Sequence, residues 1–164
     1  MVNKEVIDCY NETSVDSVNI PEEYYRSKHE IKDKSYQKLS EILSLGNIEF
    51  FTITVLIGKF IVEDDEYENL PEVKSNPFFK LNDYAKSKDE MHILEAFAVQ
   101  EVDNIYILKD YVAMRDIWQK YSCRGFEKIY EWYSDNNINL EVKLAEELQK
   151  TFTNNGEVSL ELEE

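Results

Sequence analysis

Residues 87–136, SKDEMHILEAFAVQEVDNIYILKDYVAMRDIWQKYSCRGFEKIYEWYSDN, decide the fold of this chain. Ser87 and Glu90 have the spacing of a capping box, in which each side chain bonds to a backbone N–H at the start of a helix. The apolar residues that follow repeat at helical spacing on both sides of that helix, so we expect it to be buried all round. They are Met91, Ile93, Leu94, Phe97, Ala98 and Val99.

A second helix follows, with Asp103 or Asn104 in the position of its N-terminal cap. Its apolar and aromatic side chains form one stripe at helical spacing, which predicts core packing in preference to an exposed binding platform. The stripe comprises Ile107, Tyr111, Met114, Trp118 and Tyr121, and it continues with Phe126, Ile129, Tyr130 and Tyr133. Because glycine weakens a helix interior by about 1 kcal/mol, we expect a kink or break near Gly125.

The composition favours a mainly α fold, a compact single-domain bundle of five or six helices. The chain has 164 residues, of which 43% are hydrophobic, and this is enough to bury a core. Its four glycines and three prolines are fewer turn residues than a sandwich or barrel needs. We predict that one core contains Phe51, Leu94, Phe97, Tyr111, Met114, Trp118 and Ile129.

Residues 47–61 allow two interpretations. Gly46 suits the left-handed residue that ends one helix, and Asn47 suits the cap that begins the next. We therefore predict a helix. The same segment is rich in β-branched residues, which prefer strands, so an α+β domain with a strand at 50–62 is the alternative.

We expect three parts: an irregular N-terminal arm at 1–32, a helical domain at 33–152 and an acidic flexible tail at 153–164. Residues 63–72 contain six acids and no base, which is typical of an exposed loop. Residues 76–79 read NPFF and predict a turn whose aromatic side chains pack on the core.

The chain lacks the motifs of common enzymes. Its glycines stand only at 46, 58, 125 and 156, so it has neither a P-loop nor a G-x-G-x-x-G motif. No serine has the glycine neighbours of a nucleophile elbow. His29 and His92 lack nitrogen or sulfur partners at ligand spacing, and His92 is expected in the core. We therefore predict no enzymatic activity, no metal site and no cofactor.

The cellular setting follows from other absences. Cys9 and Cys123 are isolated, which suggests a reducing compartment. The first ten residues are charged and do not resemble a secretion signal. The most apolar run, at 50–62, is too short to span a bilayer. We expect a cytoplasmic protein that binds no membrane.

A formal net charge of −16 argues against direct binding to nucleic acid. Two surfaces are candidates for contact with a protein partner. One is basic and is formed by Arg115, Lys120, Arg124 and Lys128. The other is acidic, could imitate nucleic-acid phosphates, and is formed by Glu63, Asp64, Asp65, Glu66 and Glu68. A third hypothesis is that the cations pair with the chain's own acids.

The order of several motifs resembles a small family encoded beside bacterial DNA-phosphorothioation (Dnd) gene clusters. An apolar helix ends in LIGKF at 56–60, an aromatic turn follows at 77–78, and a buried helix lies at 93–99. The last motif is YSCRGFEKIY at 121–130, and the resemblance covers about residues 33–133. It implies a place in prokaryotic defence against foreign DNA, with no assigned reaction.

Two functions follow as hypotheses. The first is a non-enzymatic accessory protein of a DNA-modification or anti-phage defence system, which binds a protein partner through the basic surface. The alternative is an acidic, phage-encoded anti-defence or anti-restriction protein that inhibits a DNA- or RNA-processing enzyme by mimicking nucleic acid. Electrostatic steering toward a basic target would favour the mimic.

Overall fold

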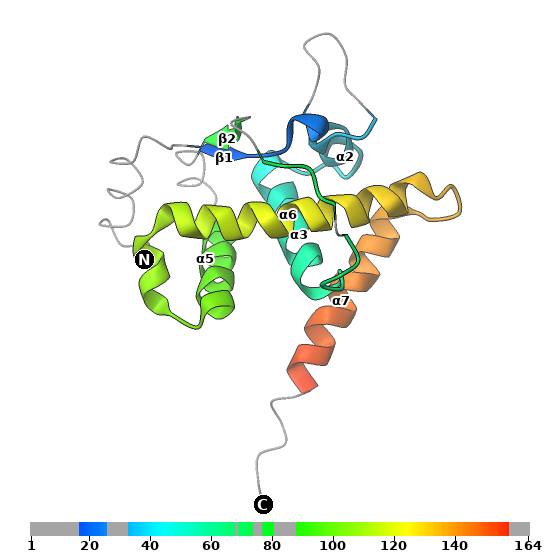
Figure 1. The fold of residues 1–164 in the computed structure, drawn as a ribbon. Coiled ribbons are helices and arrows are strands. Elements are labelled where there is room, and N and C mark those ends of the chain that lie inside the picture. The colour runs from blue at the N-terminus through cyan, green and yellow to red at the C-terminus, as the bar shows by residue number, and fades with distance from the viewer. Residues whose placement is uncertain (1–16, 26–32, 68, 74–76, 81–87, 158–164) are drawn as a thin grey trace, which may run out of the picture.

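Five α-helices dominate the part of the chain that the computed structural model describes, namely residues 17–25, 33–67, 69–73, 77–80 and 88–157 (Figure 1). The helices are α2 (Tyr36–Ile42), α3 (Asn47–Phe60), α5 (Lys88–Val102), α6 (Tyr111–Ser134) and α7 (Leu140–Glu157). The other described elements are the 3₁₀ helices η1 (Glu22–Tyr24) and η2 (Ile105–Lys109) and the strands β1 (Ser17–Asn19) and β2 (Pro77–Lys80). The prediction of a mainly α fold is confirmed.

Helices α3 and α6 cross at the centre of the molecule, with their backbones in contact (Figure 1). A Cβ atom at Gly125 would lie 1.8 Å from the carbonyl oxygen of Thr54, and one at Gly58 would lie 1.9 Å from that of Tyr121. Helix α6 continues through Gly125, so the predicted break there is wrong. Only glycine lets the two backbones come this close, and this requirement outweighs the low helix propensity of glycine.

Helix α3 buries eight of its fourteen residues, and the alternative of a strand at 50–62 is wrong. Packing against α2, α5 and α6 outweighs the intrinsic strand preference of its β-branched side chains. The hydroxyls of Thr52 and Thr54 donate to the carbonyl oxygens of Ile48 and Phe51 at 2.9 and 2.6 Å. These buried polar groups are therefore satisfied within the helix.

The turn between α2 and α3 differs from the prediction. Ser44, with φ of 55°, is the residue in the left-handed conformation, and Gly46 is extended. Gly46 is the N-cap of α3, and its N–H donates to the carboxylate of Glu49 at 2.8 Å. Asn47 is consequently the first residue of the helix instead of its cap.

The predicted core is confirmed, because all seven of its residues are buried in one cluster. Helix α5 differs from the prediction. It buries the face that carries Met91, Leu94 and Phe97, but Ile93 on another face is 43% exposed. The expectation of a helix buried all round is therefore wrong for α5. Ser87, from the predicted capping box, lies outside the described residues.

Residues 17–25, which the sequence assigns to an irregular arm, pack on the core. Strand β1 pairs antiparallel with β2 and places Val18 opposite Phe79, and both side chains are buried. Tyr24 is also buried, with its ring centroid 4.2 Å from that of Phe126. Residues 77–80 form strand β2 and not the predicted turn, but Phe79 confirms that the aromatic side chains of this segment pack on the core.

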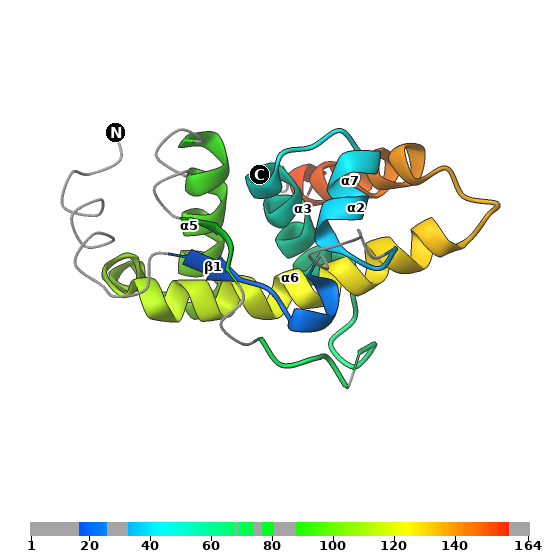
Figure 2. The same cartoon turned by 90° about the horizontal axis from the view of Figure 1, so that it is seen from above.

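Helix α7 turns back from the end of α6 and continues to Glu157, beyond the expected end of the domain at 152 (Figure 2). Leu140 and Leu144 bury its inner face. Among the described residues, no single helix is long and apolar enough to cross a membrane. The pair α2 and α3 meets those criteria together, by length and composition, with a bend of 100° between them.

Candidate functional site

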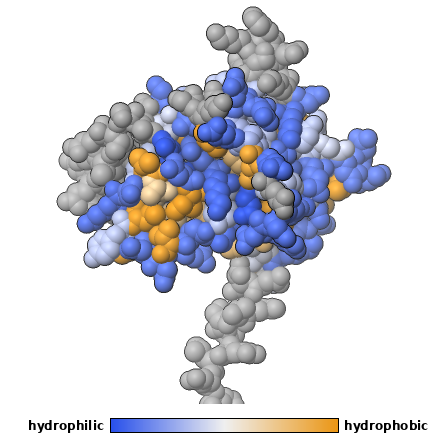
Figure 3. All heavy atoms as spheres, viewed as in Figure 1, coloured by the Kyte–Doolittle hydropathy of each residue, from blue (hydrophilic) through white to orange (hydrophobic). Residues whose placement is uncertain are grey.

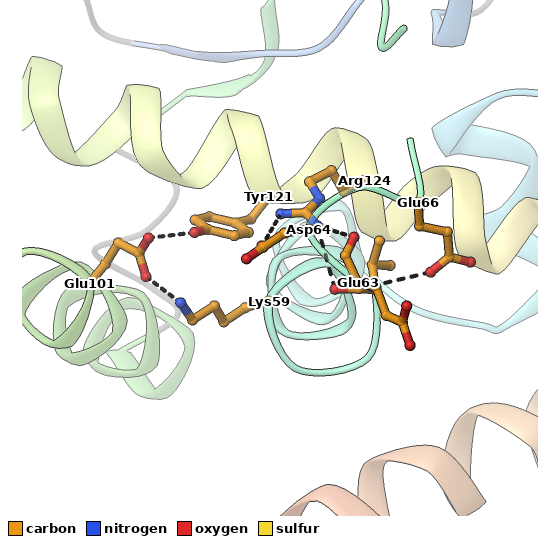
Figure 4. Close-up of polar contacts among 8 residues, drawn as sticks. Lys59, Glu63, Asp64, Glu66, Glu101, Tyr121 and Arg124 are labelled. Carbon is orange, nitrogen blue, oxygen red and sulfur yellow. Dashed lines mark hydrogen bonds and ion pairs between the residues drawn. The ribbon is translucent and has the colours of Figure 1, made fainter. Parts of the chain in front are cut away.

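The four cations predicted to bind a partner do not form one exposed face. Arg115, Lys120, Arg124 and Lys128 all lie on α6. Arg124, however, is only 5% exposed, and the side chain of Lys128 is 17% exposed. Both contact the loop after α3, which carries the predicted acidic surface. Figure 4 shows the contacts of Arg124.

The guanidinium of Arg124 binds the backbone of the loop that follows α3. Its Nη2 donates to the carbonyl oxygen of Glu63 and, at 3.4 Å, to that of Val62. Its Nη1 lies 3.4 Å from the carboxylate of Asp64, whose side chain is fully exposed. Hydrogen bonds from a charged donor are strong, whereas an ion pair with an exposed carboxylate contributes little. Arg124 therefore acts mainly through the backbone of the loop.

Lys128 fixes the next part of the same loop. Its ammonium donates to Glu66 and, at 3.4 Å, to Glu131, which also accepts from the hydroxyl of Tyr67 at 2.7 Å. Burial opposes the charge on Glu66, but hydrogen bonds from Lys128 and from the N–H of Glu63 outweigh it. The pKa of Glu66 consequently lies below its ordinary value. The loop is thus tied to α6 at successive residues.

A second charged group joins α3, α5 and α6 (Figure 4). The ammonium of Lys59 donates to Glu101 at 2.6 Å, and the hydroxyl of Tyr121 donates to the other oxygen of the same carboxylate. Burial raises the pKa of Glu101, but the hydrogen bonds from Lys59 and Tyr121 outweigh burial and lower it overall. The hydrogen bond to Glu101 raises the pKa of Lys59.

We expect Glu101 to make the free energy of unfolding depend on pH. Its folded pKa lies below the ordinary value of 4.5, so its contribution is complete above 4.5 and is lost as the pH falls through the folded pKa. The measurement is urea unfolding of the parent and of Glu101→Gln across this range. The stability difference between them should shrink as the pH drops below 4.5. A difference that is constant with pH would contradict the role of Glu101.

The remaining cations of α6 differ in exposure, since the side chain of Arg115 is 15% exposed and Lys120 lies at the surface. Arg115 donates to the carboxylate of Asp116 from Nε at 3.3 Å and from Nη2 at 3.1 Å. Lys120 is exposed, and its ammonium lies 5.4 Å from the ring centroid of Tyr121. Intramolecular pairing with acids is therefore confirmed for Arg115, Arg124 and Lys128.

The acidic surface is only partly available. Glu63, Asp64 and Asp65 are exposed, whereas the carboxylate of Glu66 is bound to Lys128. Glu68 lies outside the described residues. The structure thus places the predicted acidic and basic surfaces against each other, which the separation of their residues in the sequence does not reveal.

Other groups with chemical potential are dispersed. Among the described residues, no three His, Cys, Asp or Glu side chains are grouped so that they could hold a metal ion. The side chain of His92 is 49% exposed and lies 3.6 Å from the carboxylate of Glu95, so its expected place in the core is wrong. Burial and the nearby charge of Glu127 raise the pKa of Cys123 to about 12, which keeps it a thiol at neutral pH.

A pocket of about 320 Å³ lies beside η1 and α2. The described residues that line it, none of which is acidic or basic, are Ile20, Tyr24, Tyr25, Tyr36, Gln37, Asn47 and Phe78. The hydroxyl of Tyr24 donates to Glu127, and that of Tyr36 donates to the carbonyl oxygen of Ser122 at 3.0 Å. Both hydroxyls are therefore hydrogen-bonded within the protein.

An exposed apolar surface lies where α5, η2 and α6 meet, and the sequence analysis missed it. Val102 and Val112 are 40% and 39% exposed, and Ile105 and Tyr106 are 65% and 71% exposed. We call these four residues the apolar corner. Hydrophobic side chains gather over this part of the molecule (Figure 3). No residue of η2 is buried, although four of its five residues are apolar or aromatic.

Local hydrogen bonds hold the apolar corner in shape. The side chain of Asn104 accepts from the N–H of Tyr106 at 2.9 Å, and that of Asp110 accepts from the N–H of Ala113 at 3.0 Å. Asp103, between α5 and η2, adopts a left-handed backbone with φ of 51°. The caps fix both ends of η2, so its exposed side chains are presented in one arrangement.

The chain was also compared with known proteins. The sequence resemblance to the family beside Dnd gene clusters stays a prediction. Comparisons with protein-family models, with curated proteins and with solved structures find no match to this chain.

Proposed function

We propose that this protein is a non-enzymatic interaction protein whose partner binds the apolar corner. The observation that carries the proposal is η2, where Ile105 and Tyr106 project into solvent and no residue is buried. Each Å² of apolar surface left in water forgoes about 25 cal/mol of stabilisation. Contiguous exposed apolar patches on soluble domains commonly mark protein interfaces.

The apolar corner has the properties of an interface centre. Tyrosine is enriched among the residues that dominate binding energy, because its large ring buries much area and loses few rotamers. The caps at Asn104 and Asp110 hold this segment before a partner binds, which lowers the entropy lost on association. Ile105 and Tyr106 are therefore the proposed anchors.

The predicted partner-binding cations take different roles in this proposal. Val112, Asp116 and Lys120 recur every four residues on α6 and so share one face of the helix. We assign Lys120 to the polar rim of the interface, because it is exposed on this face, whereas the side chain of Arg115 is 15% exposed and binds Asp116. Arg124 and Lys128 instead hold the loop after α3.

The proposed setting is a prokaryotic DNA-modification or anti-phage defence system. Its support is the sequence resemblance to the family encoded beside Dnd gene clusters. An accessory role fits the described side chains, since no group of metal-ligating side chains occurs among them.

Photo-crosslinking in cells that express the protein tests this function. A photoreactive phenylalanine derivative placed at position 106 should give a defined adduct with one protein. The matched control is the same derivative at position 152, because Phe152 is 64% exposed on α7, away from the apolar corner. The adduct should be absent from position 152 and from a position-106 sample that also carries Ile105→Ser. If position 106 gives no adduct, or gives the same adducts as position 152, the proposal is wrong.

The nucleic-acid mimic is the second candidate. The observation in its favour is the exposure of Asp64 and Asp65 at the tip of the loop, in a chain with a net charge of −16. In that case the partner would be a basic nucleic-acid-processing enzyme, and binding would compete with DNA or RNA. Rising salt would weaken such binding steeply, because the contact would be mainly electrostatic.

A further inference from the structure

We infer that the partner segment bound by the apolar corner carries large apolar side chains flanked by lysine or arginine. This inference rests on the proposed function and specifies the chemistry of the partner. It combines two observations, the exposed apolar residues of η2 and the carboxylates on either side of them.

The apolar part of the segment is set by the corner itself. Ile105 and Tyr106 expose most of their side chains, and Val102 and Val112 extend the same surface onto α5 and α6. Only an apolar partner surface removes these groups from water without leaving buried polar groups unpaired. The matching segment therefore presents aliphatic or aromatic side chains at its centre.

The basic flanks are set by the charges around η2. Asp103 and Asp110 stand at its two ends and are exposed. Two cations lie nearby: Arg115 binds Asp116, and Lys109 is exposed, with its ammonium 5.6 Å from the ring centroid of Tyr106. Asp103, Asp110 and Asp116 outnumber Lys109 and Arg115 around η2, so the local charge is net negative and complements lysine or arginine on the partner.

The net charge opposes a second copy of this chain as the occupant. Two copies would each bring a formal charge of −16, and a two-fold interface would place Asp103 and Asp110 near the same residues of the other copy. Like-charge juxtaposition in an interface is costly. The charge likewise opposes an anionic membrane as the occupant.

Three short synthetic helical peptides test the inference by fluorescence anisotropy with the full chain. One contains leucine and lysine, the second leucine and glutamate, and the third serine and lysine. The leucine–lysine peptide should bind more than about tenfold tighter than either of the others, because only this peptide supplies both features. Equal binding of the leucine–lysine and leucine–glutamate peptides would contradict the prediction that the partner segment has basic flanks. Equal binding of the leucine–lysine and serine–lysine peptides would overturn the apolar centre.

Variants locate the binding site. Ile105→Ser with Tyr106→Ser should weaken the leucine–lysine peptide more than about tenfold, whereas Phe152→Ser should leave it unchanged. Asp103→Asn with Asp110→Asn should weaken it about threefold or more, since asparagine retains both the left-handed backbone and the helix cap. The matched control, Asp64→Asn with Asp65→Asn, removes two charges from the loop and should have no such effect. The inference is wrong if the loop pair weakens binding more than the corner pair.

Two further measurements test whether a second copy of the chain or an anionic membrane binds the apolar corner. Sedimentation equilibrium should show a monomer, and a dimer that Ile105→Ser dissociates would overturn the inference. Phosphatidylglycerol vesicles should not bind the chain, and binding that the same substitution abolishes would also overturn it. A partner crosslinked at position 106 through an acidic segment would overturn the basic flanks and leave the proposed function intact. If no partner is crosslinked at position 106, the proposed function itself is wrong.

Discussion

Replacing Gly125 by alanine is expected to destabilise the protein by about 4 kcal/mol or more, an effect reserved for severe disruption of a core. The new Cβ would lie 1.8 Å from the carbonyl oxygen of Thr54, which is backbone and cannot rotate away. Alanine favours a helix over glycine by about 1 kcal/mol, which is too little to offset separation of two packed helices. Urea unfolding gives the change in free energy directly.

Gly58→Ala should have a similar effect, because its Cβ would lie 1.9 Å from the carbonyl oxygen of Tyr121. The control is Gly46→Ala, where the nearest atom is the Glu49 carboxylate at 3.5 Å, an ordinary contact. This change should cost about 0.5–1 kcal/mol, because alanine is a poorer N-cap than glycine. If Gly125→Ala were as mild as Gly46→Ala, the close crossing of α3 and α6 would be wrong.

Trp118→Ala should cost about 3–5 kcal/mol. The indole has no exposed surface, its Nε1 donates to the carbonyl oxygen of Leu94 at 2.9 Å, and its ring lies edge-on to Tyr111. Its removal leaves a large cavity between α5 and α6 and deletes that hydrogen bond. The change in unfolding free energy is measured by urea titration.

Phe152→Ala is the control for Trp118→Ala. It also removes an aromatic ring, but one that is 64% exposed on α7, so the expected change is within about 0.5 kcal/mol. Equal effects of the two substitutions would contradict the assignment of Trp118 to the core. The slope of the unfolding curve should stay unchanged if both variants unfold from the same folded state.

The helices and the core could be predicted because their signals are local. The spacing of Tyr111, Met114 and Trp118 identifies one face of α6 without knowledge of any other element. Gly125 could not be interpreted in this way, since its role depends on Thr54, which lies far away in the sequence. Propensity alone assigns such a glycine to a break, whereas packing uses it for close approach.

The charged residues show a similar limit. Spacing correctly places Lys120, Arg124 and Lys128 on α6, but it does not show which of them points to solvent. Arg124 is buried because the end of α3 arrives beside it, a contact between distant segments. The apolar corner was missed for the opposite reason. Periodicity treats every apolar residue as core, so Ile105 and Tyr106 resemble the buried residues that follow them.

The central claim is that the apolar corner, and not the charged surfaces, binds the partner. Isothermal titration of the partner identified by crosslinking tests it with two variants. Ile105→Ser with Tyr106→Ser should reduce affinity more than about thirtyfold, because both proposed anchors are lost. Asp64→Lys with Asp65→Lys should leave affinity within about threefold of the parent. The opposite result, with binding lost only on reversal of the loop charges, would contradict the claim and support the nucleic-acid mimic.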